Sequence, residues 1–204
     1  HYPLRRQRQM CIRDRVWTPY DPTLAHPDVR LAGPSAEHLL GTDRFGRDTA
    51  SRIMAGAQIT VFVGLIAVGI AALVGVPLGI LAGMRRGTWV DALVMRGADL
   101  LLAFPALLLA IIAGAVWGPS TLTAMVAIGI AGIPSFARVA RSGTLQVITQ
   151  DFISSARISA VPGWKVALRH ILPNLTGLLI VQASVYFALA ILAEAGLSYL
   201  GLGT

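Results

Sequence analysis

Long apolar stretches alternate with short polar segments along this chain of 204 residues. No charged residue occurs at positions 53–84, 100–137 or 171–193. A helix needs roughly 20 residues to cross the hydrocarbon core of a bilayer. The pattern therefore predicts four membrane-spanning helices, near residues 59–82, 99–116, 122–136 and 175–192.

Prolines interrupt three of these predicted spans. Pro77, Pro105 and Pro134 each remove a backbone hydrogen bond, which tends to kink a helix. Small residues such as Gly75 and Gly79 allow neighbouring helices to approach closely. Tight packing is the favoured interpretation of this pattern, and a hinge or a role in the translocation path is the alternative.

Composition places the chain among polytopic membrane proteins. Hydrophobic residues make up 55% of it and charged residues 13%, against roughly 25% charged in an average soluble domain. Five arginines and one aspartate within residues 1–15 supply much of the net charge of +7, so the basic balance does not indicate nucleic acid. We interpret residues 1–15 as a non-native basic segment, with a disordered basic arm as the alternative. The single cysteine, Cys11, lies there, so no disulfide can form within the chain.

Basic residues near the span ends predict the orientation, because loops rich in Lys and Arg stay on the cytoplasmic side. Residues 138–169 carry five basic residues against one acidic, and residues 85–96 carry three against one. Both segments are therefore expected in the cytoplasm, and residues 16–52 outside. This arrangement calls for a preceding span, and the apolar C-terminal stretch suggests a following one, so we expect an internal fragment that lacks its first and last spans.

A polar, basic insert at residues 151–174 separates the last two predicted spans. Phe152, Ile153, Ala156 and Ala160 follow roughly helical spacing, and Pro162-Gly163 is expected to end that helix. A return helix over residues 164–172 is expected before Pro173 opens the next span. Such a hairpin can dock into a groove of a soluble partner or lie on the membrane surface without a partner, and the spacing favours neither.

The same insert resembles the cytoplasmic signature loop of bacterial ABC importer permeases. That pattern has Glu-Ala-Ala, three residues, Gly, and a closing Leu-Pro after a further stretch. Ala160 takes the position of the Gly, so both the acid and the glycine of the pattern are missing here. The resemblance implies ATPase-coupling residues at Ser154, Ser155, Ala156, Arg157, Ala160, Val161, Trp164, Leu172 and Pro173.

Four further segments resemble the C-type permease of dipeptide, oligopeptide and nickel importers. They are HLLGTDRFGRD at 38–48, VPLGILAG at 76–83, DLLLAFP at 99–105 and ILAEAGLSYLGLG at 191–203. The resemblance covers residues 16–204. The first segment supplies an extracytoplasmic motif, Gly41, Thr42, Asp43, Gly46, Arg47 and Asp48. For residues 16–52, contact with a solute-binding protein and a solvated loop are the alternatives. The GTDRFGRD run within them has a structural role as a further alternative, with turns at its glycines and ion pairs among Asp43, Arg44, Arg47 and Asp48.

The resemblance implies an all-α, polytopic transmembrane helical bundle of the type I ABC importer permease kind. Residues 16–57 would lead into the first span from outside, and residues 58–204 would form the permease domain, with a cytoplasmic coupling loop at 138–173. Its implied location is the bacterial inner membrane. The implied partners are a second permease subunit forming a heterodimer, two ATPase subunits, an extracytoplasmic solute-binding protein and membrane lipid, without nucleic acid.

The chain has no ATPase motif of its own. A phosphate-binding loop needs GxxxxGK[ST], and the only lysine, Lys165, lies in GWKV. We expect no catalytic residue, no metal ligand and no bound cofactor here, with ATP and Mg²⁺ held by the partner ATPases. The expected function is to couple their ATP hydrolysis to import, with di- or oligopeptide favoured over nickel as the substrate.

A membrane-embedded enzyme and a channel are the alternative functions. An enzyme would need His, Asp, Glu or a serine with its base inside the membrane, whereas the four histidines lie before the first span or at a loop end. A channel would show a repeated polar stripe, which no predicted span has. No span is expected to contain a buried charge pair, and Asp99 and Glu194, near span ends, are expected to be solvated.

Overall fold

The computed structural model describes residues 18–118 and 120–199, apart from the side chain of Arg157. Within this part the structure is all-helical, as predicted, and contains no strand, only an isolated bridge between Thr42 and Asp48. The predicted non-native segment, residues 1–15, lies outside the described residues. The elements are the 3-10 helix η1 (Pro27–Val29), α2 (Thr49–Met84), α3 (Trp89–Leu102), α4 (Ala106–Trp117), α5 (Thr121–Val147), α6 (Asp151–Ile158), α7 (Gly163–Val166), the π-helix η2 (Ala167–Ile171) and α8 (Leu172–Tyr199).

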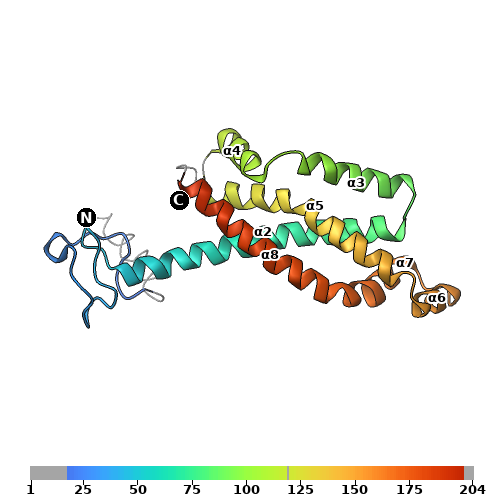
Figure 1. Cartoon of the computed structure of the whole chain (residues 1–204), viewed down its shortest axis with the longest axis horizontal. Helices are drawn as coiled ribbons and strands as arrows, with labels where there is room; N and C mark the ends of the chain where they lie inside the picture. The colour runs from blue at the N-terminus through green and yellow to red at the C-terminus, as the bar shows by residue number, and fades with distance from the viewer. Residues whose placement is uncertain (1–17, 119, 200–204) are drawn as a thin grey trace, which may run out of the picture. The chain divides into compact units, whose positions relative to one another are not determined.

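The chain divides into two compact units, residues 1–61 and 62–204, and the boundary falls within α2. The described part of the first unit consists of loops, η1 and the start of α2. In the second unit, α5 packs against α3, α4 and α8 (Figure 1). This makes α5 the central helix of the second unit.

Three helices are long and apolar enough to cross a membrane. They are α2, α5 and the continuous helix Gly163–Tyr199, which joins α7, η2 and α8. Three of the four predicted spans are thereby confirmed as helices. All three extend beyond the predicted limits, because the flanking polar residues contain no helix-breaking signal strong enough to stop them.

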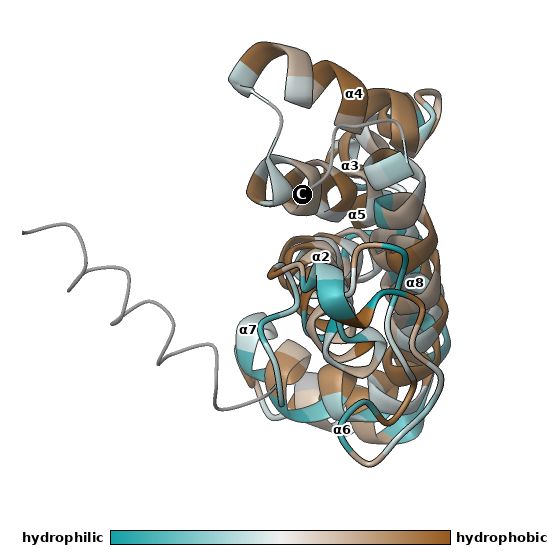
Figure 2. Cartoon of the chain, turned by 90° about the vertical axis from the view of Figure 1, so that its left-hand side faces the viewer, coloured by the Kyte–Doolittle hydropathy of each residue, from teal (hydrophilic) through white to brown (hydrophobic). Residues whose placement is uncertain are grey.

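The predicted span at 99–116 is not one straight helix. It is divided between α3 and α4, which meet at a bend of 80° (Figure 1). Pro105 causes the break, because it lacks an N–H and disfavours helical conformation at the preceding Phe104. Helix α4 is apolar along most of its length (Figure 2). The two helices meet the criteria for a membrane span only as a bent pair.

The other two intrahelical prolines, Pro77 and Pro134, lie within continuous helices. Pro134 is buried, whereas Pro77 is exposed, and the close helix packing lies at the glycines on either side of Pro77. A Cβ added at Gly75 would lie 2.6 Å from the carbonyl oxygen of Ile133, and one added at Gly79 would lie 2.3 Å from that of Ala137. Both glycines of α2 therefore allow contact with the backbone of α5, as the packing interpretation requires.

Ion pairs join α3 to α5, and of their residues only Asp99 lies within a predicted span, at its first position. The guanidinium of Arg141 donates through Nε to Asp91 Oδ1 at 2.6 Å and through a terminal nitrogen to Oδ2 at 2.8 Å. Arg138 pairs with Asp99, and both of these side chains are more than half exposed. The sequence pattern placed both arginines in a loop beginning at residue 138, and that limit was wrong. Helix α5 continues to Val147, and its last turns carry them toward the acids of α3.

Candidate coupling hairpin and extracytoplasmic loop

Helix α6 is anchored to the second unit by one face and exposed on the other. Ile153 is fully buried in the main core cluster, which also contains Val76 and Ile80 of α2, and Ala156 packs against that cluster. Ser155 is exposed, and Ile158 is 87% exposed. The amphipathic spacing of the sequence therefore fixes which face of α6 points away from the bundle.

The end of α6 forms a Schellman motif. The N–H of Val161 donates to the carbonyl of Ala156 at 3.1 Å. Ala160, which lies between α6 and α7, has φ 52°. This left-handed position usually holds glycine, since a Cβ strains it. Ala160 takes the position of the glycine in the signature loop that this insert resembles, and it adopts the left-handed turn without a glycine.

The predicted end of the first hairpin helix needs correction. Helix α6 ends at Ile158, before Pro162, which is the N-cap of α7 and accepts from the N–H of Lys165 at 2.9 Å. The sequence signal for this earlier end was weak, because no glycine or proline follows Ile158 directly.

Pro173 does not open a separate helix. It lies inside the continuous helix Gly163–Tyr199, two residues after the last residue of the π-helix η2, Ile171. In η2 the N–H of Leu172 donates to the carbonyl of Ala167, five residues back. The wider π turn accommodates a proline that would clash with the carbonyl four residues earlier in an α-helix. The side-chain amide of Asn174 donates to the His170 carbonyl at 2.6 Å, which supports the same turn.

The structure separates the predicted coupling residues into an exposed set and an anchoring set. Ser154, Ser155, Ala160, Trp164 and Pro173 are exposed, and Ala156, Val161 and Leu172 are partly buried against the core. The side chain of Arg157 lies outside the described part of the chain. The exposed residues do not form one cluster around a catalytic centre. They are spread over the outer side of α6, the turn after it, α7 and the start of α8.

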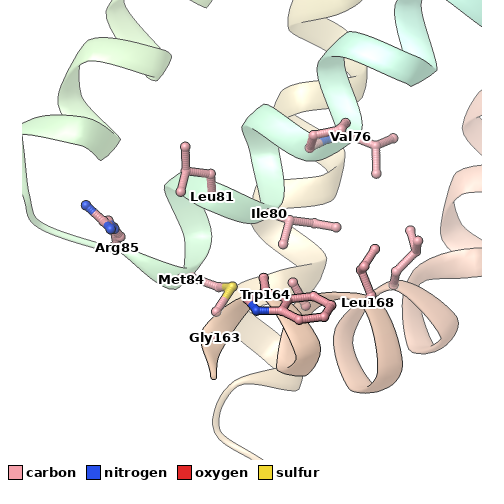
Figure 3. A pocket seen from close by; sticks show the side chains of 11 residues that line it. Val76, Ile80, Leu81, Met84, Arg85, Gly163, Trp164 and Leu168 are labelled. Atoms are coloured by element: carbon pink, nitrogen blue, oxygen red, sulfur yellow. The ribbon is translucent and has the colours of Figure 1, made fainter. Parts of the chain in front are cut away.

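An apolar groove of about 590 Å³ lies between α2 and the start of the last long helix, and the sequence reasoning did not anticipate it. Figure 3 shows Met84 between Arg85 and Trp164, with Leu168 farther along the wall. Trp164 is 63% exposed, and the Lys165 ammonium lies 5.4 Å from the centre of its ring. The run VPLGILAGM was an available signal, since it presents apolar residues on more than one face of α2.

Two glycines shape the extracytoplasmic motif. Gly41 has φ 69° and Gly46 has φ 76°. A Cβ at Gly46 would lie 1.8 Å from the carbonyl oxygen of His26, and one at Gly41 would lie 2.4 Å from that of Ala32. Each position therefore requires glycine for both conformation and space.

The two aspartates of the motif accept hydrogen bonds from several donors. Asp43 receives the backbone N–H groups of Arg47 and Phe45 and an Nη1–H bond from Arg52 at 2.6 Å. These groups, the N–H of Arg47 first, hold the pKa of Asp43 below its usual range. Thr42 accepts a hydrogen bond from the N–H of Ala32 at 2.9 Å. The loop is thus organised around polar side chains of the motif.

Asp48 forms a buried network at the start of α2. It accepts from the N–H of Ser51 at 2.7 Å and from its hydroxyl at 2.6 Å, and its other oxygen lies 3.1 Å from Nδ1 of His38. Burial acts to raise the pKa of Asp48, but the bonds from Ser51 and His38 more than offset this effect. The pKa of Asp48 therefore lies below its ordinary value.

The expected ion pairs among the four charged residues of the motif do not form within the described structure. Asp43 pairs with Arg52, and Asp48 pairs with His38. The guanidiniums of Arg44 and Arg47 instead lie 5.3 and 5.1 Å from the centre of the Phe45 ring. Both guanidiniums are thus within reach of a cation–π interaction with this ring.

Comparison with known proteins identifies the family. Residues 75–204 match the family described as binding-protein-dependent transport system inner membrane component. The dipeptide transport system permease protein DppC of Alkalihalophilus pseudofirmus is 44% identical over 178 residues, 87% of this chain and 58% of the relative. The glutathione transport system permease protein GsiD of Pectobacterium atrosepticum is 40% identical over 186 residues, 91% of this chain and 62% of the relative.

A third relative is the probable D,D-dipeptide transport system permease protein DdpC of Escherichia coli, 40% identical over 184 residues, 90% of this chain and 61% of the relative. The chain spans about three fifths of the length of these curated relatives. The resemblance inferred from the separate motifs is confirmed. Together with its long apolar helices, this match shows that the chain is a multi-pass membrane protein that belongs to the family of binding-protein-dependent transport system inner membrane components.

Proposed function

We propose that this chain is the membrane-spanning part of a permease subunit in an ATP-driven, binding-protein-dependent importer. The observation that carries the proposal is the hairpin of α6 and α7, which projects an exposed turn from a helix anchored in the core. Family membership supports the same conclusion, since the matched family belongs to binding-protein-dependent transport. The subunit moves a solute across the membrane and takes its energy from a partner.

The coupling step is docking of α6 into a groove of an ATPase subunit. Ser154, Ser155 and Ile158 form a mixed polar and apolar outer face, which suits a protein groove better than a lipid surface. On the inner face, Ile153 shares a core cluster with Val76 of α2. Because a packed core transmits displacement rather than absorbing it, movement of α6 shifts α2 with it.

The partners follow from this coupling role. Two ATPase subunits bind ATP and Mg²⁺, a second permease subunit completes the pathway as a heterodimer, and a solute-binding protein delivers the substrate from outside. The basic end of the bundle, which holds Arg85, Arg86, Lys165 and Arg169, faces the cytoplasm under this proposal. The chain contributes no catalytic residue to ATP hydrolysis.

Di- or oligopeptide is the proposed substrate. The relatives described above are named for dipeptide, glutathione and D,D-dipeptide transport, and all three substrates are small peptides. Nickel, the alternative that the motif resemblance left open, has no support among these three names. Uptake of a labelled dipeptide by cells that express the full-length subunit with its partners tests this assignment.

The extracytoplasmic motif has a structural role in this proposal, with contact to the solute-binding protein as the second candidate. The positive φ of Gly41 and Gly46 and the buried network of Asp48 support the structural role. The exposed Arg44 and Phe45 favour the second. Replacing Arg44 with Gln separates the two roles, because it should weaken docking of the binding protein without altering insertion.

Cross-linking in membranes tests the coupling role. Ser155→Cys and Ser159→Cys place nearly isosteric thiols on the exposed side of the hairpin, and Ser198→Cys provides a matched exposed control at the far end of α8. In the full-length protein with its ATPase, the first two should form nucleotide-sensitive cross-links to the ATPase and the third should not. An inserted protein with no such cross-link would return α6 to a surface-lying structural element.

A further inference from the structure

The groove between α2 and the last long helix is apolar inside and basic at its edge. Val76, Ile80 and Leu81 line it from α2, and Leu168 lines it from η2. Of the described residues that line it, Arg85 is the only charged one and none is acidic. Its volume of about 590 Å³ falls within the range of roughly 300–1,000 Å³ typical of sites for small molecules.

The rim of the groove has the composition of a bilayer interface. Trp164 lines the groove and is largely exposed, and the ammonium of Lys165 lies over its ring. Tryptophan is enriched at the level of lipid headgroups because its ring is apolar while its N–H is polar. The groove also lies where α2 ends, at Met84, and where the last long helix begins, at Gly163. Its opening is therefore at headgroup depth and its interior at acyl-chain depth.

The two cations at this rim are available to a ligand. Within the described residues neither Arg85 nor Lys165 forms an ion pair, whereas Arg52, Arg138 and Arg141 each pair with an aspartate. Both side chains are exposed. A phosphate group bearing a negative charge would complement them, and an acyl chain attached to it would cover the apolar walls below.

We propose that this groove binds an anionic phospholipid of the cytoplasmic leaflet, with an acyl chain along Ile80 and Leu168 and the phosphate between Arg85 and Lys165. A pair of cations beside an apolar groove favours an anionic lipid over a zwitterionic one. The anionic headgroup has a net negative charge, whereas in a zwitterionic headgroup a cationic group balances the phosphate. The proposal rests on the membrane orientation given above. Its position beside α7 makes the coupling hairpin sensitive to the lipid that occupies the groove.

The test uses the full-length protein with its co-purifying subunits in mixed vesicles of phosphatidylcholine and phosphatidylglycerol. Each lipid is supplied in turn as an analogue with a photoreactive group in its acyl chain, and labelled peptides are mapped by mass spectrometry. Peptides containing Leu81 and Leu168 should be labelled several-fold more by the phosphatidylglycerol probe. Arg85→Gln and Lys165→Gln should each lower that preference by a factor on the order of five.

Matched variants separate headgroup recognition from general damage. Arg96→Gln removes an exposed cation of α3 that does not line the groove, and it should leave the preference unchanged. Ala167→Phe fills the groove and should lower labelling by both probes, whereas Ala188→Phe adds the same ring at an exposed site of α8 and should not. Co-purification of the other subunits shows that each variant is assembled.

Two results would overturn the proposal. Equal labelling by the two probes would mean that the groove does not recognise an anionic headgroup. Absence of groove labelling by either probe would mean that protein covers it, either the second permease subunit or another part of the full-length chain. Neither result bears on the permease function itself, because the cross-linking test of α6 is read independently of lipid.

Discussion

Replacing Ala160 with glycine should stabilise the coupling hairpin, although glycine destabilises a helix at most other positions. Ala160 has φ 52° and occupies the left-handed position of the Schellman motif that ends α6. A Cβ at such a position lies too close to the following carbonyl oxygen, and glycine removes this strain. The substitution deletes one exposed methyl group and no hydrogen bond.

The expected gain is the difference between two terms. Relief of the left-handed strain is worth roughly 1–2 kcal/mol, and the greater freedom of glycine in the unfolded chain costs about 0.4–1 kcal/mol. The net stabilisation of the hairpin is therefore about 0.5–1 kcal/mol. Since a factor of ten corresponds to about 1.4 kcal/mol, local opening should become roughly two to five times rarer.

Amide hydrogen exchange in the full-length protein measures this opening directly. The N–H of Val161 is the reporter, because its bond to the Ala156 carbonyl exists only while the motif is closed. Its exchange should slow by the same factor of roughly two to five in Ala160→Gly. Amides at the centre of α5 report global stability and should not change.

Ser159→Gly is the matched control, one residue earlier in the same turn. Ser159 does not have a positive φ, and its hydroxyl donates to the Ser155 carbonyl at 3.0 Å. Glycine there adds freedom and relieves no strain, so exchange of the Val161 amide should become faster. If both substitutions accelerated exchange, the left-handed conformation of Ala160 would not be a source of strain and the reasoning would be refuted.

Three further predictions concern helix packing and the first unit. Asp91→Asn should destabilise the detergent-solubilised protein by about 1–3 kcal/mol in thermal unfolding, since it leaves the partly buried Arg141 without its carboxylate. A double variant with arginine at position 91 and aspartate at position 141 should recover part of this stability. Gly79→Ala should cost about 1–3 kcal/mol by overpacking, whereas Gly69→Ala, with nothing within 4 Å of the added Cβ, should not. The pKa of Asp48 is lowered in the folded state, so its stabilising contribution is complete above its ordinary pKa of about 3.9 and is lost as the pH falls through the lower folded value. The rate of limited proteolysis of residues 18–61 should therefore increase at acid pH. Asp48→Asn should make this rate less dependent on pH.

Local properties of the sequence were enough to predict the spans and the family. The absence of charge over residues 53–84 and 171–193 requires a bilayer or a buried core whatever the neighbours are, and helices form there in the structure. The bend at Pro105 is equally local, because the proline ring acts on its own backbone and on the residue before it. Several motifs in a fixed order identified the permease family, and the comparison confirmed it.

Contacts between distant segments decided what the sequence left open. The pairing of Asp91 with Arg141 joins residues 50 positions apart, and only the packing of α3 on α5 brings them together. The left-handed turn at Ala160 runs against the preference of alanine, and anchoring of Ile153 and Val166 in one core cluster imposes it. The groove beside Trp164 is lined jointly by α2 and the last long helix, so it is a property of neither helix alone. Backbone hydrogen bonds within a helix depend on nearby residues, so the sequence determines them, whereas side-chain pairing depends on which helices pack together.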